Sequence, residues 1–216
     1  MNSKPVTADK ITIESTMHYK DTPVLHYRIE YPRFHDSGNR MALEDINDWY
    51  RKHAMDLQKK YETELYRDAV DLFEYTVRNQ FPFHMFEAVS AYDLTYDQDG
   101  VVSLYHDEYT YTGGAHGSTV RRSETWDTRT GQRLSLFQFV KDPTGYHEKI
   151  MDAIRQQAEL QIQRGENIYF EDYPQLISEH FNPESFYLTP EGVVIYFQQY
   201  EIAPYAGGLP EFTIPF

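Results

Sequence analysis

Residues 10–31, KITIESTMHYKDTPVLHYRIEY, decide the class of fold. Lys10–Tyr19 and Val24–Tyr31 alternate between apolar and polar side chains, which is the two-residue period of a half-buried strand. Lys20–Pro23, between them, have the composition of a turn. The chain is therefore predicted to begin with an antiparallel hairpin.

A long helix is predicted after this hairpin, over about residues 40–79. Asn39 has the short polar side chain preferred at a helix N-cap. Pro82 marks the expected end, because a proline disfavours the helical conformation in the residue that precedes it. Apolar residues recur every three or four positions and form one stripe, which predicts a helix packed along a sheet: Leu43, Ile46, Tyr50, Ala54, Leu57, Tyr61, Leu65, Ala69 and Leu72.

The later elements follow the same two periodicities. Asp142 is the expected cap of a second helix, and Gly165 is its expected end. Turn residues at Asp97–Gly100 and Thr189–Gly192 join two pairs of strands into hairpins. The full set comprises strands at 83–96, 101–110, 118–128, 185–188 and 193–197, helices at 143–164 and 173–181, and a short apolar element at 134–139.

The order of elements, ββαββ followed by βαββ, defines the expected class. Strands joined by turn-length connections pair antiparallel, and helices interspersed with them pack on the sheets. We therefore predict an α+β fold of antiparallel sheets, with one long helix in the N-terminal half and one helix in the C-terminal half packed on them. The weakest division falls near residues 111–118. The two halves on either side of it either share one sheet or form independent domains.

Composition excludes several kinds of function. The 216 residues include no cysteine, so disulfides, zinc–thiolate sites and cysteine nucleophiles are excluded. The formal net charge of −14 would repel nucleic acid. It either serves solubility alone or favours a basic protein as partner.

Neither membrane insertion nor secretion is predicted. No apolar run of about 18 residues occurs. Met1–Lys10 lack the apolar core of a signal peptide. Two origins stay open: a cytoplasmic protein, or the soluble part excised from a longer one.

The first candidate for chemistry is the turn Gly113-Gly114-Ala115-His116-Gly117. Glycine N–H groups can cradle an anion, and His116 could act as an acid or base. No helix follows to add its dipole, so the preferred interpretation is a tight connection in which only glycine tolerates positive φ. Gly113, Gly114 and Gly117 are then structural, and His116 orders the turn.

No metal site, cofactor or catalytic centre is predicted elsewhere. The nine histidines show no H-x-H or H-E-x-x-H spacing. The densest cluster of donors, His106-Asp107-Glu108, would be split between the two faces of a strand. Carboxylate pairs such as Glu44 and Asp45 lie on the solvated side of the long helix. We therefore expect no enzymatic activity.

The C-terminal residues 195–216 are the other distinctive segment. Tyr200, Tyr205 and Phe212 there either close a core at the chain end or form an aromatic recognition surface. Prolines and glycines predict that the segment is a rigid, irregular extended strand: Pro204, Gly207, Gly208 and Pro210.

Two motifs carry a resemblance to a bacterial family. Residues 110–117, TYTGGAHG, and residues 200–215, YEIAPYAGGLPEFTIP, resemble the extracytoplasmic part of RsiV-type anti-sigma factors. In that family an N-terminal module, also similar to the accessory domain of PdaC-type peptidoglycan deacetylases, precedes a C-terminal one, and both were long classed as domains of unknown function. The resemblance implies a first module at about residues 10–110 and a second at 111–216, which are either independent or one compact unit.

The resemblance implies a non-catalytic module of the bacterial envelope that binds C-type lysozyme. The acidic charge is compatible with such a basic partner. The candidate binding residues within the motifs are Tyr111, His116, Tyr200 and Tyr205. The alternative is an accessory domain that binds peptidoglycan or another glycan through exposed aromatic rings.

Overall fold

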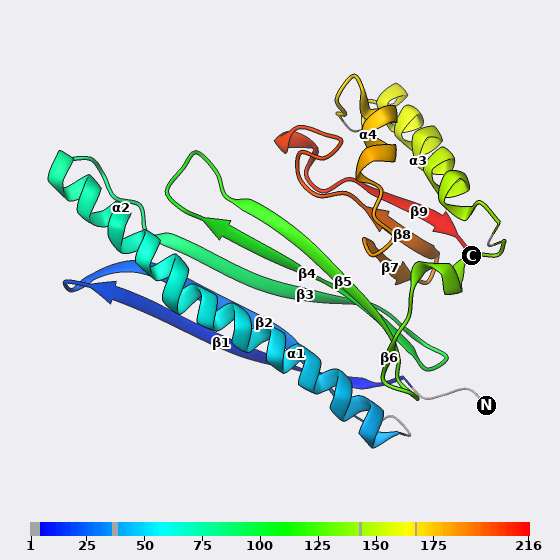
Figure 1. The fold of residues 1–216 in the computed structure, drawn as a ribbon, viewed down its shortest axis with the longest axis horizontal. Coiled ribbons are helices and arrows are strands. Elements are labelled where there is room, and N and C mark those ends of the chain that lie inside the picture. Colours follow the sequence, from blue (N-terminus) through cyan, green and yellow to red (C-terminus); the bar gives the residue numbers. More distant parts are fainter. Residues whose placement is uncertain (1–4, 36–38, 143, 167) are drawn as a thin grey trace. The chain divides into compact units, whose positions relative to one another are not determined.

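The computed structural model describes residues 5–35, 39–142, 144–166 and 168–216. The predicted α+β class is confirmed, with sheets dominated by antiparallel pairs and the longest helix in the N-terminal half (Figure 1). The strands are β1 (Thr7–Tyr19), β2 (Thr22–His35), β3 (Phe86–Gln98), β4 (Val101–Tyr111), β5 (Ser118–Asp127), β6 (Gln132–Arg133), β7 (Phe186–Thr189), β8 (Gly192–Tyr196) and β9 (Glu211–Pro215). The α-helices are α1 (Arg40–Lys60), α2 (Tyr66–Asn79), α3 (Tyr146–Gln163) and α4 (Tyr173–His180).

The predicted first hairpin is confirmed, although its strands are longer than expected. β1 and β2 pair antiparallel from Thr7 opposite His35 to Tyr19 opposite Thr22. The turn is tight because Lys20 and Asp21 both adopt left-handed conformations, with φ of 47° and 64°. The predicted turn residue Pro23 instead lies within β2, beside a register shift between Met17 and His18.

The predicted long helix is also confirmed, and it contains a π-helical turn that the periodicity did not reveal. Asn39 caps the start, accepting hydrogen bonds from the main-chain N–H groups of Met41 (3.2 Å) and Ala42 (3.4 Å). The end is set by Gln80, whose left-handed φ of 58° lets its N–H bond back to the last turn. Between α1 and α2, Tyr61–Leu65 form the π turn.

One sheet follows the order β1-β2-β3-β4-β5-β6. The prediction of purely antiparallel pairing is wrong at one place, because β2 and β3 run parallel, with Leu25 opposite Phe86. The connection between these two strands is the long helix rather than a turn. A helical crossover returns the chain in its original direction, so parallel pairing follows.

The second sheet, β7-β8-β9, is antiparallel and is covered by α3 and α4 (Figure 1). The predicted cap of α3 is wrong. Gly145, with φ of 62°, precedes the helix, and Asp142 instead accepts a hydrogen bond from the Thr144 N–H at 3.0 Å. Pro143, the predicted first helical residue, lies outside the described residues. Gly165 follows the helix with φ of 67°, as predicted.

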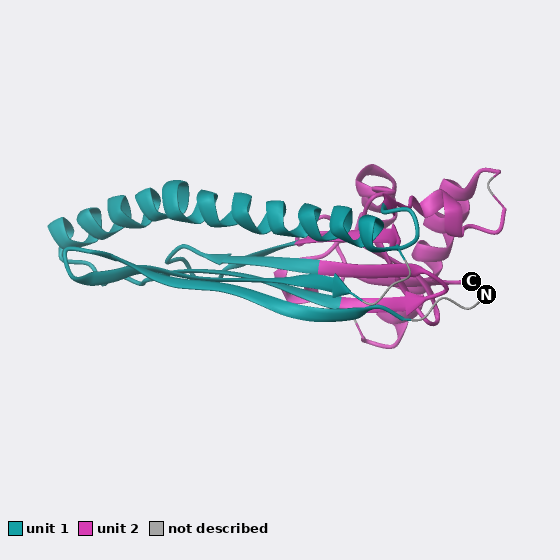
Figure 2. Cartoon of the chain, turned by 90° about the horizontal axis from the view of Figure 1, so that it is seen from below, with its two compact units in different colours: residues 1–93, 106–120, 128–131 teal, residues 94–105, 121–127, 132–216 magenta. Residues whose placement is uncertain are grey.

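The chain forms two compact units, drawn in teal and magenta in Figure 2. One contains residues 1–93, 106–120 and 128–131, and the other contains 94–105, 121–127 and 132–216. Strands β3, β4 and β5 thus contribute residues to both units. Within the described ranges, no helix combines the length and apolar character needed to cross a membrane. The predicted modules 10–110 and 111–216 stay a prediction.

Each unit has its own apolar core. In the first, β2 and the helix meet through Tyr27, Ile29, Ala54 and Leu57. In the second, α3 and α4 pack on β7, β8 and β9 through a larger set of buried side chains, which include Ile150, Ile154, Ile177, Leu188, Ile195, Phe197 and Phe212.

Candidate functional site

Tyr200 and Tyr205 lie together between β8 and β9. Their ring centroids are 6.2 Å apart and their planes are tilted by 32°. The two residues are 51% and 39% exposed. Tyr200 adopts φ of 68°, a conformation that costs free energy for a residue with a bulky side chain. The fold therefore holds a strained residue in a position that brings two exposed aromatic rings together.

The surrounding tail is anchored, and it is less extended than predicted. Pro204 precedes a single 3-10 turn, Tyr205–Gly207, and Gly208 ends that turn with φ of 65°. Ile202 and Ala203 are fully buried. The carbonyl of Pro210 accepts a hydrogen bond from the Phe197 N–H at 2.9 Å. The segment is therefore a turn followed by β9 rather than the extended strand that the prolines and glycines predicted.

Of the two interpretations of the tail, Phe212 fits closure of the core and not a recognition surface. Phe212 is 1% exposed, and its ring packs edge-on against Phe197 at 6.0 Å between centroids. It lies on β9, where side chains alternate between the core and solvent. Both interpretations of the tail thus hold for different rings: Phe212 closes the core, and the Tyr200–Tyr205 pair faces solvent.

The sequence around this pair is uniformly acidic or neutral. Residues 165–216 contain no lysine and no arginine. They contain eight carboxylate side chains: Glu166, Glu171, Asp172, Glu179, Glu184, Glu191, Glu201 and Glu211. A second stretch, residues 79–120, also lacks lysine and arginine and carries six carboxylates, so the acidic charge is divided between two segments of the chain.

The glycine-rich turn lies between β4 and β5, in the other unit from the tyrosine pair. Gly113 has φ of 87°, and an added Cβ would lie 3.2 Å from a Leu72 methyl carbon. At Gly117, an added Cβ would lie within 2.6 Å of the Tyr109 ring. His116 Nδ1 lies 3.0 Å from the Gly117 carbonyl oxygen. These glycines permit close packing of the turn.

Of the four candidate binding residues, the structure brings two together. Tyr200 and Tyr205 form the pair described above. Tyr111 ends β4, half-buried, and His116 is exposed in the turn that follows. At Gly114, an added Cβ would lie 3.9 Å from the His116 carbonyl oxygen, an ordinary van der Waals contact, so sterics do not require glycine there.

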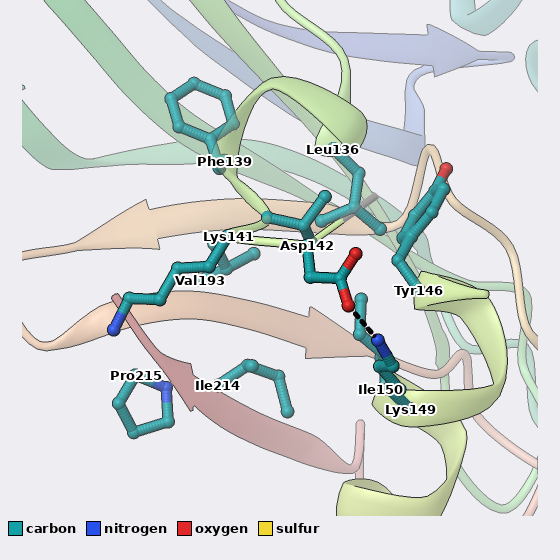
Figure 3. A pocket seen from close by; sticks show the side chains of 11 residues that line it. Leu136, Phe139, Lys141, Asp142, Tyr146, Lys149, Ile150, Val193, Ile214 and Pro215 are labelled. Carbon is teal, nitrogen blue, oxygen red and sulfur yellow. Dashed lines mark hydrogen bonds and ion pairs between the residues drawn. The ribbon is translucent and has the colours of Figure 1, made fainter. Parts of the chain in front are cut away.

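A hollow of about 250 Å³ lies beside the start of α3 (Figure 3). Its rim carries charge, but that charge is paired. The Lys149 ammonium forms an ion pair with Asp142, and Lys141 donates to the main-chain oxygen of Phe216. The hydrogen bond from Lys149 lowers the pKa of the Asp142 carboxyl. The lining is mostly apolar, formed by Leu136, Phe139, Val140, Tyr146, Ile150, Val193, Ile214 and Pro215. The hollow therefore suits an apolar ligand group better than a polar group that takes part in a reaction.

A histidine–carboxylate contact lies in the first unit and includes Glu108, one of the donors that the sequence analysis did not expect to form a metal site. His53 Nε2 is 3.1 Å from Glu108 Oε1, and the His53 ring stacks on Trp49 with centroids 5.5 Å apart. The His106 ring lies 5.8 Å from that of His53. Among the described residues, no three histidine or carboxylate side chains are grouped as metal ligands. The contact links α1 to β4.

An arginine in β5 is the main polar feature that the sequence did not reveal. Arg121 is 7% exposed, and its guanidinium lies 3.7 Å above the centre of the Tyr105 ring. The Tyr187 and Tyr196 rings lie at 6.0 Å and 5.8 Å. Glu211 of β9 forms an ion pair with it. Arg121 therefore ties β5 to β9 within the second unit.

Two family models match the chain. Residues 19–119 match the model described as Deacetylase PdaC, and residues 138–216 match a protein family of unknown function, DUF3298. The N-terminal part of the chain is thus similar to the PdaC model, and the C-terminal part is similar to the DUF3298 model. Over 219 aligned residues it is 24% identical to the peptidoglycan-N-acetylmuramic acid deacetylase PdaC of Bacillus subtilis (strain 168), an alignment that covers 99% of this chain. The chain spans 42% of the length of that relative.

Two crystal structures share the fold. A DUF3298 family member from Bacteroides fragilis superposes with a TM-score of 0.73 at 19% identity, covering 100% of this chain and 92% of the other. A DUF3298 family protein from Pseudomonas aeruginosa PAO1 gives 0.61 at 18% identity, covering 98% and 90%. At these identities, the likeness establishes the fold alone.

Proposed function

We propose that this chain is a non-catalytic protein-binding module of the bacterial envelope, of the kind found in RsiV-type ectodomains. Its partner would be lysozyme or a similarly basic cell-wall hydrolase. The observation that carries the proposal is the exposed Tyr200–Tyr205 pair, held by a strained main chain inside a segment without basic residues.

Tyrosine pairs of this kind suit protein recognition. Tyrosine supplies a large contact area with few rotatable bonds, and it is enriched at the energetic centres of interfaces. Backbone strain persists only where the surrounding structure stabilises it. Residues with such strain cluster at functional sites. Tyr200 combines both features, since its φ is 68° and half of its surface is exposed.

Charge supports a basic partner. The chain carries a net charge of −14, and the 52 residues that contain the pair have carboxylates but no lysine or arginine. A basic protein would be attracted over about one Debye length, which grows as salt is lowered, and its arginine and lysine side chains can stack on tyrosine rings. The association should therefore weaken as salt increases.

Titration of hen egg-white lysozyme by calorimetry tests this function. We expect a saturable complex, weaker at higher salt, and a loss of about tenfold or more in affinity for Tyr200→Asn combined with Tyr205→Ser. Asparagine tolerates the left-handed conformation of position 200. Tyr75→Ser is the matched control, because Tyr75 is 55% exposed in the other unit. Absence of any complex at tens of micromolar protein would exclude lysozyme as the ligand.

The second candidate function is glycan binding. The Bacillus subtilis relative is named a peptidoglycan-N-acetylmuramic acid deacetylase, and aromatic rings such as those of Tyr200 and Tyr205 can pack against the apolar faces of sugars. Co-sedimentation with insoluble cell wall discriminates between the two. Glycan binding should persist at high salt, whereas binding of a basic protein should not.

A further inference from the structure

We propose that two copies of this chain pair through the outer edge of β1, antiparallel, about a two-fold axis at Thr12. This surface lies in the first unit and does not depend on the Tyr200–Tyr205 pair. The proposed partner is a second copy of the chain, identified by the self-complementary order of side chains along the strand.

β1 is a long edge strand. It extends over 13 residues, Thr7–Tyr19, and is the first strand in the order of its sheet. Its outer edge pairs with no other strand in the described part of the chain. Strands average about 5–6 residues, and a long unpaired edge is a template for pairing with another chain. No proline interrupts β1, and its register shift falls at Met17 and His18, beyond the centre of the strand.

The direction of the β1 main chain can be deduced from its neighbour. Phe34 donates its N–H to the Asn47 side chain (2.7 Å) and accepts from it at its carbonyl (2.8 Å). Phe34 lies opposite Ala8, so these two residues form a pair without mutual hydrogen bonds. Because the pattern alternates, the N–H and C=O groups of every second β1 residue point away from β2: Ala8, Lys10, Thr12, Glu14 and Thr16.

Pro32 agrees with this assignment. It lies opposite Lys10, at a position in β2 whose main-chain nitrogen points away from β1. Proline has no N–H to donate, so it fits only where the ladder needs none. The outer edge of β1 therefore offers alternating donors and acceptors between residues 8 and 16.

The side chains of β1 favour one register for this pairing. With the axis at Thr12, Lys10 lies opposite the partner's Glu14, and Ile11 lies opposite the partner's Ile13. Axes at residues 11 or 13 place Lys10 opposite a threonine. An axis at Lys10 or at Glu14 places like charges together. Opposite charges across a ladder stabilise it and like charges destabilise it, so of these axes only the one at Thr12 pairs Lys10 with Glu14.

The contacts of these charges within the chain are compatible with pairing. Lys10 Nζ lies 2.8 Å from Glu30, and Glu14 lies 3.3 Å from His26 Nε2. Lys10 is 55% exposed at its side chain and Glu14 is 53% exposed. An ammonium group carries three donors, so Lys10 can bond both to Glu30 and to the partner's Glu14.

Disulfide trapping tests the register, and the chain suits it because it has no cysteine. In the 216-residue chain, Thr12→Cys places two thiols at a hydrogen-bonded pair, where Cα atoms are about 5.5 Å apart, within the range of a disulfide. Glu14→Cys is the matched control, because its two copies would be about 13 Å apart along the strands. We expect mild oxidation to link the first variant into dimers and to leave the second monomeric.

Sedimentation velocity tests the pairing without a cross-link. We expect a concentration-dependent dimer, weakened about tenfold by Lys10→Glu and restored by combining Lys10→Glu with Glu14→Lys. Thr12→Pro removes an outward N–H and should abolish the dimer while circular dichroism shows an intact fold. A monomer at every concentration would overturn the proposal. Equal or faster trapping of Glu14→Cys than of Thr12→Cys would also overturn it.

Discussion

Arg121 shows how much one residue can organise. A buried guanidinium is costly unless its charge is met, and here Glu211 and three tyrosine rings meet it. Gln198 adds to the same junction, since its side chain bonds to both the main-chain N–H (2.9 Å) and the carbonyl (2.7 Å) of Arg121. The residue therefore joins β5 to the segment after β8 and to β9.

We predict that Arg121→Met destabilises the protein by about 2–3 kcal/mol in urea unfolding. The loss should fall short of that for a fully buried pair, because the Glu211 side chain is 40% exposed and can be partly solvated. Arg122→Met, at the exposed neighbour, should change stability by less than about 0.5 kcal/mol. Equal effects of the two changes would contradict the assigned role of Arg121.

Tyr61 makes the stability of the fold decrease at alkaline pH. Its burial raises the pKa of the hydroxyl well above the ordinary value, and the negative charge of Glu108 adds to the shift. The unfolded chain therefore releases this proton first. The contribution of protonated Tyr61 to the free energy of unfolding is fully present below about pH 10. It is lost as pH rises further, by up to about 1.4 kcal/mol per pH unit.

The corresponding test compares urea unfolding at about pH 8 and about pH 10.5. Tyr61→Phe should reduce the loss of stability between the two values, because phenylalanine has no proton to release. Tyr75→Phe, at a tyrosine that is 55% exposed, should leave the loss unchanged. A Tyr61→Phe protein with the same loss as the parent would show that the burial of Tyr61 does not govern the effect.

At the scale of elements, the π turn explains how one helix keeps one face on the sheet for so long. Leu57 and Ala69 are both buried, although they are twelve residues apart. At about 100° per residue, that separation would rotate Ala69 about 120° away from Leu57. The wider π turn at Tyr61–Leu65 absorbs one residue, which reduces the offset to about 20°.

Deletion of Thr63 should therefore be tolerated. Thr63 is exposed within the π turn, and its removal would leave a regular α-helix with both parts of the apolar stripe still on one face. We expect the melting temperature to change by only a few degrees. Deletion of Lys52, which is exposed within α1, should unfold the protein because it rotates part of the stripe by about 100°. Equal effects of both deletions would contradict this explanation.

The periodicity of the sequence predicted the position of this helix well, but not its π turn. A spacing of three or four residues is satisfied by Leu57, Tyr61, Leu65 and Ala69, so the pattern looks continuous. Only the need to keep all of these side chains against one sheet requires the extra residue. The parallel pairing of β2 with β3 was missed for a related reason, because the local sequence of a strand does not specify its partner.

At the scale of the whole molecule, the compact units and the family models divide the chain differently. The models match residues 19–119 and 138–216, whereas the second unit also takes residues 94–105 and 121–127. Within that unit, Ser103 accepts a hydrogen bond from the Leu188 N–H at 2.9 Å, and the Tyr105 ring packs on Tyr187 at 5.0 Å. The C-terminal elements thus depend on strands encoded earlier.

We predict that a fragment of residues 111–216 does not fold cooperatively. It would lack Ser103 and Tyr105, which leaves the buried Leu188 N–H without its partner and exposes the apolar face of β7 and β8. A fragment that begins at residue 94 retains these contacts and should show more ordered structure. The two are compared by circular dichroism and thermal melting. Cooperative melting of 111–216 alone would establish the predicted module boundary.

The sequence by itself determined the local elements, the absence of cysteine chemistry and the acidic charge. These properties depend on residue type and on spacing over a few turns or strands, which physical chemistry constrains strongly. The structural role of the glycines at positions 113 and 117 stays a prediction from sequence, and a Cβ added at either position would come close to Leu72 or Tyr109.

Only the tertiary structure decided which aromatic rings are exposed, which cations are buried and which strands are neighbours. Phe212, Tyr200 and Tyr205 look alike in the sequence, yet one closes the core and two form a surface pair. Arg121 and Arg122 are adjacent and chemically identical, and only one is buried. In each case burial depends on contacts between residues far apart in the chain, and no local pattern encodes these contacts.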